Sequence, residues 1–250
     1  MQIKSTNQIE NLYLKVLGYG APGSRKTRFA GSMARRFKTL ILSAEAGLLS
    51  IIDMKDEHGN PVACDYITIE KFEDIEEAYN ELRAGSLKGK YQAVALDSIT
   101  EIQKACKDWI MAKSGKDMEQ RDWGTLAMRI ERMVRAFRDL PMHVVITALE
   151  DTETDKSTGE VKVMPALQGS VQKQLPAYFD EVFYFFGKEV EIEDGRKEIK
   201  GHILTRNSGK YIGKDRSGKL PAVIADPDFG KVYDMIFPKK EEPSAKKANS

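Results

Sequence analysis

The fold of this chain is decided by the stretch Leu14-Lys15-Val16-Leu17-Gly18-Tyr19-Gly20-Ala21-Pro22-Gly23-Ser24-Arg25-Lys26-Thr27. An apolar strand leads into a glycine-rich turn, and a segment with helical spacing follows through Phe29, Ala30 and Met33. This order of strand, turn and helix is the context in which a Gly-x-x-x-x-Gly-Lys-Ser/Thr pattern forms a phosphate-binding loop. Because backbone N–H groups and a helix N-terminus attract phosphate oxygens, the stretch predicts a nucleotide site, with ATP and Mg²⁺ as the expected ligands.

The predicted phosphate cradle consists of Gly20, Ala21, Pro22, Gly23, Ser24, Arg25, Lys26 and Thr27. Lys26 is expected to reach the outer phosphates, and Thr27 is expected to place its hydroxyl on Mg²⁺. Arg25 stands where the pattern has its last glycine. A residue with a Cβ can adopt the helical conformation at a helix start, so the loop is still expected, but weaker affinity is expected because the backbone approaches the phosphates closely there. The competing interpretation is a glycine-rich turn before an ordinary helix.

Short apolar runs alternate along the chain with longer amphipathic stretches. This pattern is typical of an α/β fold with a mostly parallel central sheet flanked by helices. The expected core strands are 13–18, 39–44, 92–97, 143–148 and 181–186. Between the third and fourth strands, apolar residues at helical spacing predict a helix packed on the sheet. They are Trp123, Leu126, Ala127, Ile130, Met133, Val134 and Phe137.

Two of the expected strands end in a carboxylate. Ala93-Val94-Ala95-Leu96-Asp97 has the form of a Walker B strand, whose aspartate holds Mg²⁺. Asp97 as a helix-capping residue is the alternative. Glu45 ends the strand at 39–44 and is the candidate general base, which would orient and deprotonate the water that attacks the γ-phosphate. The alternative for Glu45 is a surface residue in the turn before Gly47.

A cluster of cations and glycines lies near the C-terminus, at 210–219. A solvated turn is its default explanation. The functional alternative is that Lys214 and Arg216 act as fingers on the nucleotide of a neighbouring subunit, where they would stabilise the charge that develops during phosphoryl transfer.

Taken together, these segments resemble the RecA-superfamily ATPases, and in particular the small phage-encoded recombination ATPases that aid single-strand annealing. The resemblance spans most of residues 12–236. The matching segments are Gly20-Ala21-Pro22-Gly23-Ser24-Arg25-Lys26-Thr27, Ser43-Ala44-Glu45, Ala95-Leu96-Asp97-Ser98, Pro165-Ala166-Leu167-Gln168-Gly169, Phe179-Asp180-Glu181-Val182 and Lys214-Asp215-Arg216. Where such proteins often place a polar γ-phosphate sensor, at the end of the fourth strand, this chain offers Thr147 or Glu150.

The resemblance implies a RecA-like P-loop domain at 12–238 with a C-terminal β extension, preceded by a lead-in at 1–11. It also implies assembly into a ring or filament with nucleotides at the subunit interfaces, action on single-stranded DNA, and a possible single-strand-binding protein as a partner. The last residues, 239–250, are polar and contain no apolar cluster, so a disordered tail is expected there.

Nucleic-acid binding has little support from the residues themselves. The arginines along the predicted helix are interleaved with Glu131, so a solvated face is favoured over a DNA groove. These arginines are Arg121, Arg129, Arg132, Arg135 and Arg138. Residues 150–163 predict an exposed loop or hairpin. Its Lys156 and Lys162 are a second candidate surface, but acidic neighbours offset their charge.

Composition excludes several other classes of protein. Lys and Arg total 39 against 38 Asp and Glu, so no global field draws the chain to nucleic acid or to an anionic membrane. Cys64 and Cys106 provide neither a disulfide framework nor a zinc site, which suits a reducing cytoplasm. No apolar run approaches the roughly 20 residues that a membrane span needs.

The function expected from these observations is Mg²⁺-dependent ATP hydrolysis coupled to single-stranded DNA in recombination, annealing or replication. A second hypothesis is a nucleotide-gated interaction or loader module that binds ATP without hydrolysing it, as Arg25 suggests. A metabolic kinase ranks last, because the sequence shows no substrate pocket or lid.

Overall fold

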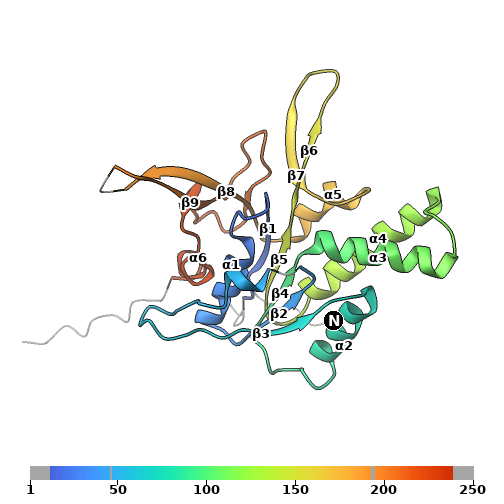
Figure 1. Ribbon diagram of the computed structural model, residues 1–250, viewed down its shortest axis with the longest axis horizontal. Helices are drawn as coiled ribbons and strands as arrows, with labels where there is room; N and C mark the ends of the chain where they lie inside the picture. The colour runs from blue at the N-terminus through green and yellow to red at the C-terminus, as the bar shows by residue number, and fades with distance from the viewer. Residues whose placement is uncertain (1–11, 46, 193–194, 239–250) are drawn as a thin grey trace, which may run out of the picture.

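The computed structural model describes residues 12–45, 47–192 and 195–238 (Figure 1). The lead-in at 1–11 and the tail at 239–250, both expected from the sequence, lie outside the described residues. A nine-stranded sheet has the order β11-β9-β8-β1-β5-β4-β2-β3, and β10 pairs with β8. Its strands are β1 (Lys15–Gly20), β2 (Thr39–Ser43), β3 (Asp65–Thr68), β4 (Ala93–Asp97), β5 (His143–Ala148), β8 (Glu181–Glu191), β9 (Lys197–Leu204), β10 (Lys214–Asp215) and β11 (Val223–Ala225).

Helices cover both faces of the sheet, as Figure 1 shows. They are α1 (Lys26–Gly31), α2 (Phe72–Arg83), α3 (Ile99–Ser114), α4 (Gln120–Arg138), α5 (Val171–Gln174) and α6 (Phe229–Ile236), with short 3-10 turns η2 (Ser32–Arg35), η3 (Leu48–Ser50) and η4 (Leu175–Tyr178). Because side chains alternate along a strand, Leu17 and Ile146 pack with α2, α3 and α4 on one face. Val16 and Val145 pack with α1 and α6 on the other. Burial on both faces explains why the central strands are continuously apolar.

The parallel strands β3, β2, β4, β5, β1 and the first half of β8 confirm the predicted α/β fold of RecA-like type. The C-terminal β extension is the antiparallel addition of β9, β10 and β11. The predicted first strand, 13–18, begins two residues later at Lys15 and runs into the glycine turn. The predicted fifth strand, 181–186, continues to Glu191, because its second half pairs with β9 as a ribbon outside the parallel core.

The helix expected from its apolar stripe is α4. It begins with a capping box, in which the Asp122 carboxylate accepts the Glu119 backbone N–H at 3.0 Å. It packs antiparallel to α3, and the two helices form an arm that projects from the sheet (Figure 1).

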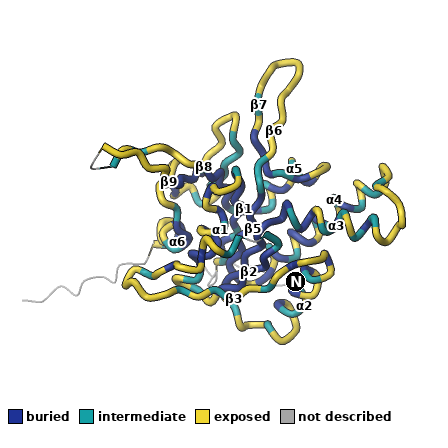
Figure 2. The backbone as a smooth tube through the Cα atoms, viewed as in Figure 1, coloured by how far each residue is buried: buried dark blue, intermediate teal, exposed yellow. Residues whose placement is uncertain are grey.

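Residues 150–163, predicted as a loop or hairpin, form the hairpin of β6 (Glu150–Thr154) and β7 (Val161–Pro165). It projects from the body of the molecule, and most of it is exposed (Figure 2). Within the described ranges, no helix combines the length and the apolarity that crossing a bilayer requires.

Candidate nucleotide-binding site

The cradle connects the end of β1 to the start of α1, at the carboxyl edge of the parallel sheet where such sheets bind ligands. Gly20 must be glycine, because a Cβ there would lie 2.3 Å from the carbonyl oxygen of Phe185 on β8. Gly23 has φ of 75°, a left-handed conformation that glycine adopts without steric cost. The Ser24 N–H donates to the Ala21 carbonyl at 3.2 Å and closes the turn. The glycines therefore permit the path of the loop, and the close approach of β8 requires glycine at position 20.

Lys26 is buried and folds back over the cradle. Its ammonium donates to the carbonyls of Gly20 and Ala21, both at 2.8 Å. Burial lowers the pKa of Lys26, and the nearby carboxylates of Glu45 and Asp97 oppose that shift. A cation placed in this way, near the loop that is to receive phosphates, can exchange carbonyl oxygens for phosphate oxygens.

Thr27 and Asp97 meet at the other end of the cradle. The Thr27 hydroxyl donates to Asp97 Oδ2 at 2.7 Å, and the Thr147 hydroxyl donates to Asp97 Oδ1. Asp97 is only 1% exposed, so its two oxygens are held in one orientation. A Cβ on Gly47 would lie 3.3 Å from Thr27 Oγ1, so the turn after β2 passes close to this pair.

The donors at this position fit Mg²⁺, which binds through one or two carboxylates, waters and substrate phosphates rather than through an all-protein cage. One hydroxyl and one carboxylate lie together next to the cradle. Among the described residues there is no group of three or more His, Cys, Asp or Glu that could hold a metal alone. A Mg²⁺ ion at Thr27 and Asp97 would therefore need the phosphates to complete its coordination.

Glu45 lies at the same edge of the sheet as Asp97. The backbone N–H groups of Ala44 and Glu45 donate to the Asp97 carbonyl at 2.7 and 3.2 Å, which ties the end of β2 to the end of β4. The Glu45 carboxylate accepts a hydrogen bond from the hydroxyl of Ser98. The structure thus brings together Lys26, Thr27, Glu45 and Asp97, which come from three separate segments of the chain.

Arg25 differs from expectation in its backbone. It was expected to adopt the helical conformation at the start of α1, but it has φ of 75° and ψ of 20°, in the left-handed region. The loop keeps the geometry that a glycine would give it, and the side chain points away to Asp226 and to the Ile199 carbonyl. The direction of the Arg25 side chain is set by tertiary contacts, because Asp226 and Ile199 both lie near the C-terminal end of the sequence.

The two candidates for the γ-phosphate sensor, Thr147 and Glu150, differ in their surroundings. Thr147 lies within β5, and its hydroxyl is engaged by Asp97. Glu150 follows at the start of β6, and its Oε2 is buried without a hydrogen-bond partner in the described part of the chain. The Glu150 charge also acts to raise the pKa of Lys26, which places it close to the cradle.

A cavity of about 720 Å³ adjoins the cradle, and sequence reasoning missed it. Its walls include Ala21–Arg25 and an aromatic shelf, which we define as Tyr184, Phe186 and Tyr211. The rings of Tyr184 and Tyr211 are stacked, with centroids 4.1 Å apart. Alternation along β8 places Tyr184 and Phe186 on one face, a signal readable in the sequence. Tyr211 is brought there by the Ile212 N–H, which donates to the Tyr19 hydroxyl at 2.7 Å.

Comparison with known proteins agrees with this geometry. The model of a family described as an AAA domain matches residues 12–217. The chain belongs to this AAA-domain family. It is therefore a nucleotide-binding protein of the P-loop ATPase class.

Solved structures similar to this AAA domain include a KaiC-like protein from the hyperthermophilic archaeon Pyrococcus horikoshii OT3, at 14% identity, with 78% of each chain covered and a TM-score of 0.43. Another is a prototypical ATPase from the type III secretion system of pathogenic bacteria, at 12% identity and a TM-score of 0.47. That match covers 84% of this chain and 55% of the other. A comparison with curated proteins gave no match.

Lys214 and Arg216 of the AAA domain do not join the cradle. Strand β10 pairs with Glu181 and Val182 at the start of β8, whereas the cradle begins opposite Phe185. The Lys214 ammonium donates to the Phe179 carbonyl at 2.6 Å and to two carbonyls of η4. Arg216 pairs with Asp180 at 2.6 Å, and 58% of its side chain is exposed. Arg216 is thus the more accessible of the two cations.

Beside these cations, Glu181 is almost completely buried and faces Asp215 across the β8–β10 pair. Its Oε1 accepts the Ser217 N–H at 3.4 Å, while its Oε2 has no partner within the described ranges. Burial and the neighbouring Asp215 carboxylate raise the pKa of Glu181 from its ordinary 4.5 to about 8. The folded AAA domain therefore holds this proton more tightly than the unfolded chain does.

Because of the raised pKa of Glu181, we expect the free energy of unfolding to depend on pH. The contribution of Glu181 to the free energy of unfolding is complete below about pH 4.5 and is lost as the pH rises through about 8. A pKa shift of this size corresponds to a loss of up to about 5 kcal/mol. Glu181→Gln, which stays neutral, should melt above the wild type at pH 9, with a gap that narrows toward pH 5. Melting temperatures across this range test the prediction, with the exposed Glu189→Gln on the same strand as control; parallel profiles for wild type and Glu181→Gln would contradict it.

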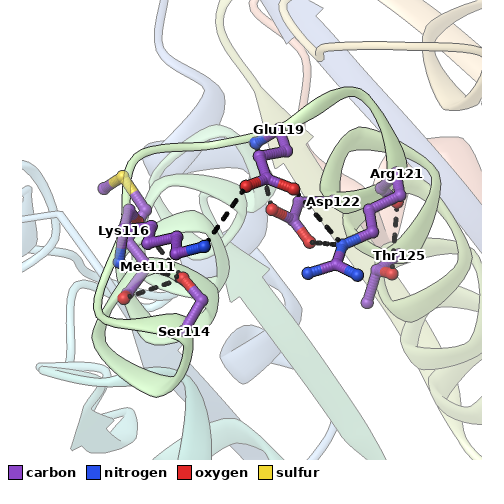
Figure 3. Close-up of polar contacts among 7 residues, drawn as sticks. All are labelled: Met111, Ser114, Lys116, Glu119, Arg121, Asp122 and Thr125. Atoms are coloured by element: carbon purple, nitrogen blue, oxygen red, sulfur yellow. Dashed lines mark hydrogen bonds and ion pairs between the residues drawn. The ribbon is translucent and has the colours of Figure 1, made fainter.

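The arginines of α4 are largely paired within the molecule. At the tip of the arm, Arg121 Nε lies 3.6 Å from Glu119 and 3.8 Å from Asp122 (Figure 3). Arg129 lies 3.3 Å from Glu76 and stacks on the ring of Trp109. Arg121 and Arg129 thus have acidic partners within the chain, and the preference for a solvated face over a DNA groove stays a prediction. In the hairpin, Lys162 likewise lies 3.5 Å from an acidic neighbour, Glu160.

Proposed function

We propose that this AAA domain is a Mg²⁺-dependent ATPase that acts on single-stranded DNA as an oligomer, in phage-type recombination, annealing or replication. The observation that carries the ATPase part is the Thr27–Asp97 hydrogen bond of 2.7 Å beside the buried Lys26. In this proposal, Lys26 neutralises the outer phosphates while Thr27 and Asp97 hold the metal. Bound Mg²⁺ would supply the positive charge that offsets the charge developing on the phosphates.

Glu45 is proposed as the general base. Its carboxylate lies at the edge of the sheet next to Asp97 and is oriented by the Ser98 hydroxyl. A carboxylate held in this way can accept a proton from a water that is within hydrogen-bonding reach. The buried, unpartnered oxygen of Glu150 and the hydroxyl of Thr147 remain the candidates for sensing the γ-phosphate.

The base and ribose of ATP are proposed to occupy the cavity beside the cradle. The aromatic shelf offers it stacked rings, and the cradle forms the adjoining wall, so one ligand could contact both. A cavity of about 720 Å³ lies in the size range of small-molecule sites.

Oligomerisation is supported by the position of the cations. Arg216 is exposed and far along β8 from its own cradle, so it could reach a nucleotide only on another copy of the chain. Lys214 would first have to break its hydrogen bonds to three carbonyls, which makes Arg216 the stronger candidate finger.

Residues 12–238 are proposed to form one ATPase domain that works in the cytoplasm. A single-strand-binding protein is proposed as its partner.

The DNA part of the proposal rests mainly on the resemblance to phage recombination ATPases. The arm adds one feature of the expected kind, because Trp123 is 36% exposed and the Lys107 ammonium lies 5.6 Å from its ring centre. Aromatic rings beside cations are the usual platform for single strands.

The test is Mg²⁺-dependent ATP hydrolysis by the purified chain, with and without single-stranded DNA. Stimulated turnover is expected. ATP hydrolysis that DNA leaves unchanged would remove the DNA part. ATP binding without turnover would replace the proposal by the nucleotide-gated module that Arg25 suggests, and no ATP binding at all would remove both.

A further inference from the structure

Two non-glycine residues with left-handed backbone conformations form an ion pair with each other. Across the described residues, the non-glycine positions with φ in the left-handed region are Arg25, at 75°, and Asp226, at 43°. The Arg25 guanidinium lies 3.3 Å from Asp226 Oδ1, although 201 positions separate them in sequence. Strained residues persist where their surroundings over-determine them, and they cluster at functional sites. The pairing of these two therefore calls for a common explanation.

The Arg25 side chain is anchored entirely outside the cradle. Besides Asp226, its guanidinium donates to the Ile199 carbonyl on β9 at 3.3 Å. Its aliphatic stem lies directly on Gly201, where an added Cβ would come within 2.7 Å of Arg25 Cδ. Asp226 is fixed to the same place, because its N–H donates to the Gly201 carbonyl at 2.8 Å. All the anchors thus belong to β9 or to the residue that follows β11.

The anchors act on the residue that precedes Lys26. A side chain with a Cβ loses free energy in the left-handed region, whereas glycine does not. The contacts of the Arg25 side chain with Asp226 and the Ile199 carbonyl can offset that cost. Both side chains are partly exposed, 39% for Arg25 and 50% for Asp226, and such pairs are weak. The conformation of the cradle is therefore held by a small margin.

We propose that Arg25 is a positioning residue that holds the cradle in its phosphate-binding conformation from outside the loop, through Asp226, the Ile199 carbonyl and the close approach to Gly201. The inference rests on the proposed function, because it takes the cradle to be the ATP site. It adds that the affinity for ATP is set by the position of β9 and β11. An ordinary P-loop, with glycine at this position, has no such dependence.

Two substitutions at one position separate this role from direct contact with the nucleotide. Arg25→Ala and Arg25→Gly remove the same charge and the same anchors, but alanine keeps the cost of the left-handed conformation and glycine does not. The dissociation constant for Mg²⁺ and a non-hydrolysable ATP analogue should rise about tenfold in Arg25→Ala. In Arg25→Gly it should rise less than about threefold.

Gly201→Ala tests the anchor from the other side. The φ of Gly201 lies outside the left-handed region, so its backbone accepts alanine, and the new methyl displaces the Arg25 stem. The variant should weaken binding of the analogue toward the level of Arg25→Ala. Gly201 also lines the cavity, so the double variant Arg25→Gly with Gly201→Ala measures the direct effect of the new methyl on the nucleotide. The loss caused by Gly201→Ala should be smaller in this background than in the wild type, because no stem remains to be displaced. Arg36→Ala is the matched control, since Arg36 pairs with Asp234 away from the cavity.

Equal losses in Arg25→Ala and Arg25→Gly would overturn the proposal, since they would mean that the guanidinium itself binds the nucleotide. Wild-type affinity in Arg25→Ala would also overturn it. If the wild type binds no ATP analogue, the proposed function fails, and melting temperatures then decide about Arg25. The melting temperature of Arg25→Gly should lie above that of Arg25→Ala, and Gly201→Ala should lower it only when Arg25 is present; equal melting temperatures would count against the anchor.

Discussion

Lys26→Ala is expected to lower kcat/KM for ATP by about a thousandfold, because it removes the buried cation that we propose neutralises the outer phosphates. A thousandfold loss corresponds to about 4 kcal/mol of transition-state stabilisation. The ammonium holds the carbonyls of Gly20 and Ala21 in the structure, and phosphate oxygens would take their place. Steady-state hydrolysis over a range of ATP concentrations measures the effect.

The control for Lys26 is Lys38→Ala, an exposed lysine before β2 that should leave turnover unchanged. Because Lys26 also holds the loop carbonyls, the melting temperature of Lys26→Ala has to be followed in parallel. A folded variant with more than a tenth of wild-type kcat/KM would show that the cradle is not the site of hydrolysis.

Asp97→Asn is expected to lower Mg²⁺-dependent turnover by about a hundredfold or more. The amide keeps the shape of the side chain but loses the charge that would hold the metal. It also turns one acceptor into a donor, although the hydroxyls of Thr27 and Thr147 both donate to the carboxylate. The dependence of the rate on Mg²⁺ concentration should therefore shift to higher concentrations, and kcat should fall.

Asp65→Asn is the matched control for Asp97. Asp65 begins the exposed strand β3, whereas Asp97 ends β4, so Asp65 lies at the other edge of the sheet. It accepts a hydrogen bond from Tyr91 at 2.9 Å. It should leave both kcat and the Mg²⁺ dependence as in the wild type. Full Mg²⁺-dependent turnover in Asp97→Asn would leave Asp97 as a structural residue at the start of α3.

The α/β architecture followed from local sequence. Parallel strands covered by helices on both faces must be apolar throughout, so β2, β4 and β5 were located within one residue of their ends. The lack of periodicity at 150–163 predicted an exposed loop or hairpin, and the structure forms the hairpin. The start of β8 at Glu181 was also predicted, but its C-terminal end was not, because the second half of β8 is stabilised by pairing with β9, a partner whose register no local pattern indicates.

The sequence by itself located the cradle, because the order of strand, glycine-rich turn and helix that marks it is a local pattern. It also placed Asp97 and Glu45 at strand ends, since parallel strands share one carboxyl edge. Only the tertiary structure decided what Arg25 does, which rings line the cavity and that Glu181 keeps its proton. Each of these depends on contacts between residues far apart in sequence, such as Arg25 with Asp226 and Tyr184 with Tyr211, or on burial by strands that pair late in the chain. Such long-range contacts and such burial form only when the chain folds, so they cannot be predicted from the type of any single residue.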